Sequence, residues 1–188
     1  MSVLKISNLV KRFEGVVAVD DLSFSVSPGE IFGFLGGNGA GKTTTLRMVL
    51  DIIRPTSGTI SVLGSPPDRR NAQAIGFLPE ERGLYAGMSA IDTIVYFARL
   101  KGMTAADARR EGLVLLERFG LGNFAKTTVD KLSKGMAQTV QLFGTIVHEP
   151  RLIVLDEPFS GLDAINQEKL EALIRAQADD GVTILFST

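Results

Sequence analysis

The chain has 188 residues, 45% of them hydrophobic, which suits one domain that buries about 70% of its unfolded surface. Its 20 Lys and Arg residues balance 21 Asp and Glu residues, and without a dense basic cluster the chain is not expected to bind nucleic acid. The absence of cysteine excludes disulfides and thiolate metal sites, and no apolar run approaches the ~18 residues of a membrane-spanning helix.

The N-terminal part predicts two β-strands, at residues 3–10 and 16–26, with a short turn at Glu14 and Gly15 between them. Polar and apolar residues alternate in these segments, which is typical of half-buried strands and unlike the continuous apolar core of a signal peptide. The chain therefore begins with an antiparallel β part. Phe13, at the end of the first strand, either stacks on a nucleotide base or belongs to the core, and its position alone favours the core.

A third strand, at residues 30–35, leads into a glycine-rich stretch that fits G-x-x-x-x-G-K-[ST] and opens a helix. Glycines let the backbone curl round an anion, and the helix N-terminus adds unpaired N–H groups and the positive end of its dipole. Lys42 supplies a charge for the β- and γ-phosphates, and the Thr43 hydroxyl is a hard ligand for Mg²⁺. The stretch predicts a site for a nucleoside triphosphate with Mg²⁺, formed by Gly36, Gly37, Asn38, Gly39, Ala40, Gly41, Lys42, Thr43 and Thr44.

The helix after this loop is expected to run to about Ile53, because Pro55 follows, and two short strands are predicted at residues 59–63 and 75–78. Residues 85–133 then form a helical subdomain within the single domain 1–188. Two capping boxes, which begin at Ser89 and Thr104, predict helices at residues 90–101 and 105–118. Whether this insert moves as a lobe or is simply a set of packed helices stays open.

An unbroken apolar strand at residues 152–156 ends in Asp156, and Glu157 follows directly. Such strands are buried on both faces of a parallel sheet, and ligands bind at the carboxyl ends of these strands. Two adjacent carboxylates repel each other, but they suit a site that holds a divalent metal and a water. We therefore assign metal binding to Asp156 and polarisation of the attacking water to Glu157, with Lys42 as the other catalytic residue.

A helix from Ser133, its expected N-cap, to His148 precedes this strand, and a helix at about 164–178 and a strand at 182–186 follow it. The predicted fold class is α/β. It consists of a P-loop NTPase core with a parallel sheet, an N-terminal antiparallel β part and a helical subdomain insert.

From Phe13 to Thr188 the chain resembles the nucleotide-binding subunits of ABC transporters. The resemblance rests on residues 36–44 as Walker A, 152–156 as Walker B, 132–136 in place of the signature sequence, and 160–163 as the D-loop. It implies that the cofactors are ATP and Mg²⁺ and that Phe13 stacks on adenine, which reverses the preference for the core. It also implies ATP hydrolysis coupled to transport, with a transmembrane permease as partner, on the cytoplasmic, inner face of the membrane.

The resemblance further implies a head-to-tail dimer, formed with an identical or a different nucleotide-binding subunit. Each ATP would lie between the Walker A loop of one subunit and the signature helix of the other, whose N-terminus binds phosphate as the glycine loop does. The residues expected to contact the partner's ATP are Ser133, Lys134, Gly135 and Asp163.

Three segments depart from the family's usual pattern. The signature reads Leu-Ser-Lys-Gly-Met instead of Leu-Ser-Gly-Gly-Gln, so Lys134 adds a cation that either reaches phosphate or is only solvated. Glu80 stands where glutamine is usual, and it either meets Mg²⁺ or its water or is a surface loop acid. Gly37 replaces a frequent proline, which loosens the loop without removing an N–H. With the stretch Pro79–Tyr85, the signature resembles that of the bacterial branch that serves exporters.

The family carries a switch histidine just beyond its last strand, and the chain is interpreted as truncated before that position because it stops at Thr188. The single histidine, His148, is predicted to be a surface residue at a helix end. The chain is therefore expected to bind Mg-ATP but to hydrolyse it on the order of 10²–10³-fold more slowly.

Two other functional classes stay open on the sequence. One is a soluble ABC-type ATPase that acts on nucleic acid or ribosomes, against which the lack of a basic patch or long charged insert argues. The other is an interaction module that binds ATP without productive hydrolysis. A GTPase is disfavoured because no Asn-Lys-x-Asp segment occurs.

Overall fold

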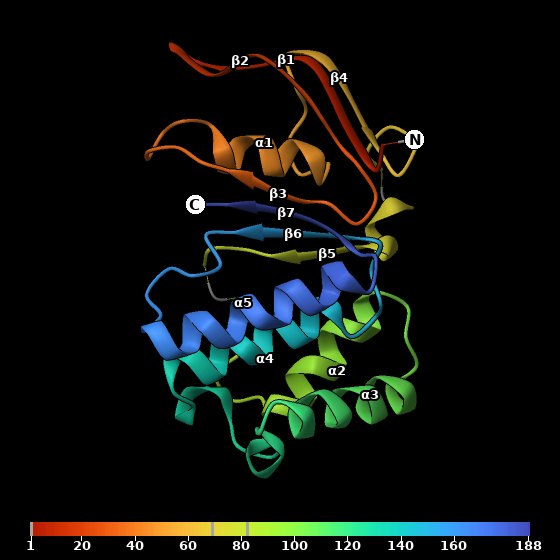
Figure 1. Ribbon diagram of the computed structural model, residues 1–188, viewed down its shortest axis with the longest axis vertical. Coiled ribbons are helices and arrows are strands. Elements are labelled where there is room, and N and C mark those ends of the chain that lie inside the picture. Colours follow the sequence, from red (N-terminus) through yellow and green to blue (C-terminus); the bar gives the residue numbers. More distant parts are fainter. Residues whose placement is uncertain (1, 69, 82) are drawn as a thin grey trace.

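A four-stranded parallel sheet, in the order β3-β7-β6-β5, lies at the centre of the computed structural model (Figure 1). The structure describes residues 2–68, 70–81 and 83–188. All residues of β6 are buried, as expected for a strand covered on both faces. The strands of this sheet are β3 (Ile31–Phe34), β5 (Ile75–Leu78), β6 (Leu152–Asp156) and β7 (Thr183–Ser187).

A second sheet is antiparallel and has the order β2-β1-β4, which confirms the predicted antiparallel start of the chain. Helix α1 (Lys42–Val49) lies between this sheet and the parallel one (Figure 1). Buried side chains from both sheets and α1, among them Leu4, Leu46 and Val154, form one hydrophobic cluster. The strands of the second sheet are β1 (Leu4–Phe13), β2 (Val16–Val26) and β4 (Ser57–Val62).

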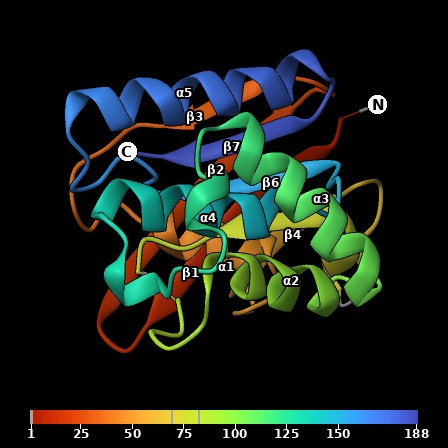
Figure 2. The same cartoon turned by 90° about the horizontal axis from the view of Figure 1, so that it is seen from below.

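Four helices lie on the other side of the parallel sheet (Figure 2), where α4 and α5 contact its strands and α2 and α3 pack on α4. They are α2 (Ala90–Leu100), α3 (Ala105–Arg118), α4 (Lys134–Ile146) and α5 (Ala164–Asp179). Ser89 and Thr104 cap α2 and α3 as predicted, because each hydroxyl accepts from the N–H three residues on. Helix α3 packs so closely on α2 that a Cβ at Gly112 would lie 2.9 Å from Ile91 Cδ1. These helices share one hydrophobic cluster with β6.

Helix α1 ends at Val49, and the prediction that it runs to Ile53 was wrong. The helix closes with a Schellman turn, in which the Ile52 N–H donates to the Arg47 carbonyl at 2.9 Å and the Asp51 N–H to the Met48 carbonyl at 3.2 Å. Asp51 takes the left-handed conformation that this turn needs, with φ 56°. The backbone therefore closes the helix before Pro55 is reached.

The other boundaries lie close to the predictions, and β5 and α3 match them. The sequence did not predict three short 3₁₀ helices, at Asn71–Ala74, Gly122–Phe124 and Val129–Lys131. In the stretch Pro79–Tyr85, Arg82 lies outside the described residues. Within the described ranges, no helix combines the length and the apolar character that crossing a membrane requires.

Candidate nucleotide-binding site

The glycine-rich loop connects β3 to α1, and two of its glycines have backbone angles that side chains disfavour. Gly39 has φ 82° and Gly41, the N-cap of α1, has φ 85°. A Cβ at Gly41 would lie 2.2 Å from the Ala18 carbonyl oxygen, so only glycine fits there. No side chain caps α1, which leaves its first N–H groups for an anion. By contrast, a Cβ at Gly37 would meet nothing within 4 Å.

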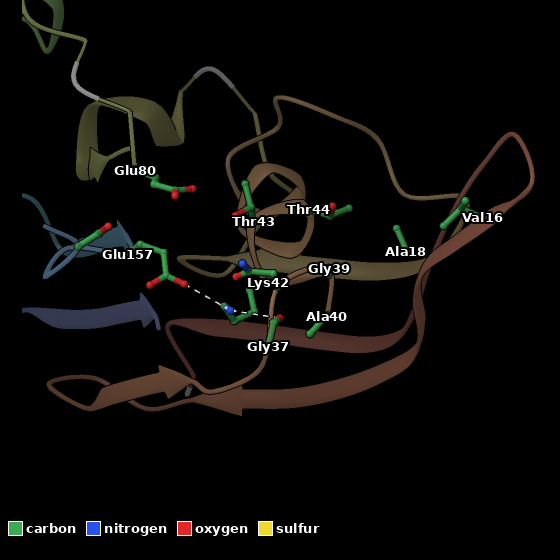
Figure 3. Close-up of a pocket in the computed structure, with 13 residues that line it drawn as sticks. Val16, Ala18, Gly37, Gly39, Ala40, Lys42, Thr43, Thr44, Glu80 and Glu157 are labelled. Atoms are coloured by element: carbon green, nitrogen blue, oxygen red, sulfur yellow. Dashed lines mark hydrogen bonds and ion pairs between the residues drawn. The ribbon is translucent and has the colours of Figure 1, made fainter.

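Lys42, the first residue of α1, lies against Glu157 at the end of β6 (Figure 3). Lys42 Nζ is 3.3 Å from Glu157 Oε1, and it also donates to the carbonyl of Gly36 and, at 3.4 Å, to that of Gly37. The side chain of Lys42 is 9% exposed and that of Glu157 is 27% exposed. The predicted phosphate-binding cation and the predicted catalytic carboxylate therefore face the same space from different elements.

Thr43 and Asp156 also meet, because the end of β6 lies beside the start of α1. Thr43 Oγ1 donates to Asp156 Oδ1 at 3.1 Å, and Asp156 is 3% exposed. A hydroxyl and a carboxylate are the hard oxygen donors that Mg²⁺ prefers, so this pair fits the predicted metal. Within the described residues, no cluster of three or more His, Asp or Glu side chains forms a cage. Mg²⁺ commonly takes one or two carboxylates together with phosphate oxygens, which this pair can provide.

Lys42, Thr43 and Glu157 line a cavity of about 630 Å³, a volume that suits a small-molecule ligand, and Asp156 lies behind Thr43. Glu80, from the loop after β5, lines the cavity on the side of Thr43 (Figure 3), so this carboxylate faces the site. The residues that line the cavity are Val16, Ala18, Gly37, Asn38, Gly39, Ala40, Gly41, Lys42, Thr43, Thr44, Glu80, Glu157 and Ser160.

Phe13 does not line this cavity, but it lies beside it. It pairs across the β1–β2 hairpin with Val16, which does line the cavity. Phe13 is 49% exposed, and Lys11 Nζ lies 4.9 Å from the centre of its ring. The first preference for Phe13 as a core residue, which the resemblance had reversed, was therefore wrong, because half of this side chain at the end of β1 is exposed.

The predicted partner contacts lie apart from the cavity, at the N-termini of α4 and α5. Ser133 caps α4, since its hydroxyl accepts from the Met136 N–H at 3.2 Å, and Asp163 caps α5 in the same way. A Cβ at Gly135 would lie 2.4 Å from the Asn166 side chain, so the two helix starts are in contact. Hydrogen bonds from the Asn166 backbone and side chain lower the pKa of Asp163. Ser133, Lys134 and Asp163 are exposed.

His148 is not the surface residue that the sequence predicted. Both ring nitrogens are buried, and neither has a hydrogen-bond partner among the described residues. Burial lowers the pKa of His148 from 6.5 to about 4, and the charge of Lys101 acts in the same direction. The reason for the error is that Lys101, which is distant along the chain, lies near the His148 ring, although Glu149 and Arg151 beside it are exposed.

Sequence comparison decides the family, because residues 19–160 match a family described as ABC transporter. The chain belongs to the ABC transporter family. An uncharacterized ABC transporter ATP-binding protein of Bacillus subtilis, YhaQ, is 45% identical over 185 residues, which are 98% of this chain and 62% of YhaQ. Nod factor export ATP-binding protein I of Burkholderia pseudomallei is 42% identical over 181 residues, which are 95% of this chain and 60% of that protein.

Structure comparison agrees with this ABC assignment. CbiO1 of Clostridium perfringens, part of the ABC transporter complex CbiONQ, superposes with a TM-score of 0.87 at 26% identity, and the match covers 100% of this chain and 78% of CbiO1. The α/β fold with its parallel sheet, antiparallel part and helices is therefore confirmed. This ABC chain spans 62% and 60% of the lengths of the two relatives above.

Three cavity residues of this ABC chain were not among those predicted from the sequence, namely Val16, Ala18 and Ser160. Val16 and Ala18 lie within three residues of the Glu14–Gly15 turn, which was the only available signal for them. Strand pairing places them, because β2 lies across the start of α1, and no local motif encodes that approach.

Proposed function

We propose that this chain is the ATP-binding subunit of an ABC transporter that hydrolyses ATP to drive export through a separate transmembrane partner. The observation that carries the proposal is the cavity in which Lys42 and Glu157 are 3.3 Å apart, directly beside the Thr43–Asp156 pair. The name of the Nod factor export relative supports export as the direction.

The roles of the residues follow from their positions. The glycine loop and the uncapped start of α1 hold the β- and γ-phosphates, and Lys42 adds its charge. Thr43 and Asp156 hold Mg²⁺, which supplies neutralisation of the charge that develops on the transferring phosphoryl group. Glu157 polarises the attacking water. Glu80 contributes a further oxygen to Mg²⁺ or its water, from the side of the cavity on which Thr43 lies. Phe13 stacks on adenine at the hairpin tip.

The second part of the proposal is a head-to-tail dimer with another nucleotide-binding subunit. The Ser133 hydroxyl accepts from Met136 N–H, so its own O–H remains able to donate to a γ-phosphate. Lys134 adds an exposed charge at the same helix N-terminus, and Asp163 lies at the adjoining start of α5. Capped, exposed helix starts of this kind suit an anion presented by a partner.

The membrane partner is proposed to meet the helical subdomain of residues 85–133. Large apolar side chains of this subdomain are exposed, among them Tyr85 at 55% and Leu100 at 63%, and exposed apolar side chains are available to a partner. Contact with a permease there would place the subunit on the cytoplasmic, inner face of the membrane.

The test is to measure ATP binding and phosphate release from Mg-ATP for the wild type and for Glu157→Gln and Lys42→Ala. We expect Glu157→Gln to bind ATP but to release phosphate on the order of 10²–10⁴-fold more slowly, since it lacks the general base. Lys42→Ala should lose ATP binding. Wild-type binding without any release would instead support an ATP-gated interaction module, and co-purification with RNA or DNA would oppose the transporter assignment.

A further inference from the structure

Ser187 is a buried hydroxyl at the end of an apolar strand, and the proposed mechanism has not used it. It closes β7, its exposed fraction is 0%, and it pairs in register with Asp156 of β6. A buried polar side chain in such a strand requires partners, because an unpaired hydroxyl loses its bonds to water.

The partners of Ser187 are the two carboxylate residues of the site. Ser187 Oγ donates to Asp156 Oδ1 at 2.6 Å and accepts from the Glu157 N–H at 3.0 Å. Thr43 Oγ1 donates to that same oxygen of Asp156 at 3.1 Å. Because both donors point to Oδ1, the lone pairs of Oδ2 remain for a metal ion or its water.

The peptide that Ser187 holds is a strained one. Glu157 has φ 48°, in the left-handed region that residues with a side chain rarely adopt. Strain of this kind persists only where the surroundings fix it, and it is typical of functional sites. The bond from the Glu157 N–H to Ser187 fixes the backbone from which the Glu157 carboxylate reaches Lys42.

We propose that Ser187 is a positioning residue for ATP hydrolysis, which orients Asp156 toward the metal and holds Glu157 in its strained, productive conformation with one hydroxyl. This inference rests on the proposed function, because it requires Mg²⁺ at Asp156. Groups that hold a metal ligand in place affect metal affinity as well as the reaction. Without the Ser187 hydroxyl, the Glu157 N–H would lose its acceptor. Asp156 Oδ1 would keep the bond from Thr43 and lose the bond from Ser187.

Thr183, on the same strand, provides a matched control. It is 1% exposed, and its hydroxyl accepts from the Gly29 N–H at 3.0 Å and donates to the Ser27 carbonyl at 3.4 Å. Ser187→Ala and Thr183→Val therefore each remove a buried hydroxyl that joins β7 to a neighbouring segment. Only the first removal is at the carboxylate end of the strand.

The experiment measures the affinity of Mn²⁺, as a probe for Mg²⁺, for the protein with a non-hydrolysable ATP analogue, by electron paramagnetic resonance. We expect Ser187→Ala to weaken Mn²⁺ binding about 10-fold or more. Ser187→Thr, which keeps the hydroxyl, and Thr183→Val should stay within roughly threefold of the wild type. Unfolding temperatures of all variants show whether Ser187→Ala and Thr183→Val lose comparable stability.

Mn²⁺ binding by Ser187→Ala that equals that of Thr183→Val would overturn the role of Ser187. If Ser187→Ala does not fold, Ser187→Cys decides, since its thiol is of similar size but a weak donor; wild-type affinity in that variant would again overturn the role. A wild type that fails to bind Mn²⁺ with the nucleotide would overturn the metal assignment itself, and this inference with it. The two failures are thus distinguishable.

Discussion

The two helix N-termini proposed to bind phosphate, those of α1 and α4, are built in opposite ways. The start of α1 has no side-chain cap, begins at a glycine with φ 85°, and is joined to a buried lysine and two carboxylates. The start of α4 is capped by Ser133, is exposed and lies against α5. The start of α1 therefore has all of its proposed phosphate-binding groups within one chain. The start of α4 is already capped and exposes Ser133 and Lys134 to a partner. A site divided between two subunits requires these two properties.

The variants Gly41→Ala and Gly37→Ala give the strongest test of the proposed phosphate site at the start of α1. A side chain at Gly41 meets the Ala18 carbonyl and an unfavourable φ, whereas a side chain at Gly37 meets open space. We expect Gly41→Ala to weaken ATP binding by about 100-fold or more, which corresponds to roughly 2.7 kcal/mol. Gly37→Ala should bind nearly as the wild type does. Calorimetric titration with ATP measures both, and equal losses would contradict the geometry of the loop.

Phe13→Ala tests whether the exposed ring beside the cavity holds the base. Stacking of one base on an aromatic side chain contributes about 1–3 kcal/mol, so we expect ATP affinity to fall on the order of 10-fold. Phe13→Tyr keeps the ring and is the control. Unchanged ATP affinity in Phe13→Ala would show that the ring does not contact adenine.

Ser133→Ala tests the proposed phosphate site at the start of α4. Its control is Ser89→Ala, which removes the corresponding cap of α2. Each hydroxyl accepts a 3.2 Å hydrogen bond from the N–H three residues on. Both variants should therefore lose about 1 kcal/mol of stability. Only Ser133→Ala should also reduce ATP-dependent dimerisation and phosphate release, by roughly fivefold, since it lacks a hydrogen bond to the partner's phosphate. Dimerisation is followed by light scattering, and equal behaviour of the two variants would exclude the contact.

The smallest effect expected concerns His148, which belongs to neither of the two proposed phosphate sites. Its folded-state pKa is about 4 and its ordinary pKa is 6.5, so the unfolded state binds the proton more readily between these values. The stability it contributes is present above pH 6.5 and is lost as the pH falls toward about 4. As the pH falls over this range, we expect the unfolding temperature of His148→Gln to fall about 2–4 °C less than that of the wild type. Parallel curves for variant and wild type would show that other groups cause the loss.

Local sequence was enough for the elements whose signals are local. The capping residues Ser89, Thr104 and Ser133 fix the starts of three helices through bonds that span three residues. The glycine loop and the strand that ends in Asp156 were likewise predictable, because the residue types needed for phosphate and metal adjoin in the chain. The early end of α1 was missed because its Schellman turn uses Asp51 in place of the glycine that would have signalled it.

The sequence by itself therefore determined the α/β class and the order of the strands along the chain, and it was enough to propose the residues for phosphate and metal. Only the tertiary structure decided which distant residues meet. Parallel pairing of β6 with β7 places Ser187 on Asp156, and the approach of β2 to α1 brings Val16 and Ala18 to the cavity. The exposure of Phe13 and the burial of the His148 ring nitrogens were decided in the same way. The physical reason is that burial and strand register depend on which layers pack together, and no short segment encodes that choice.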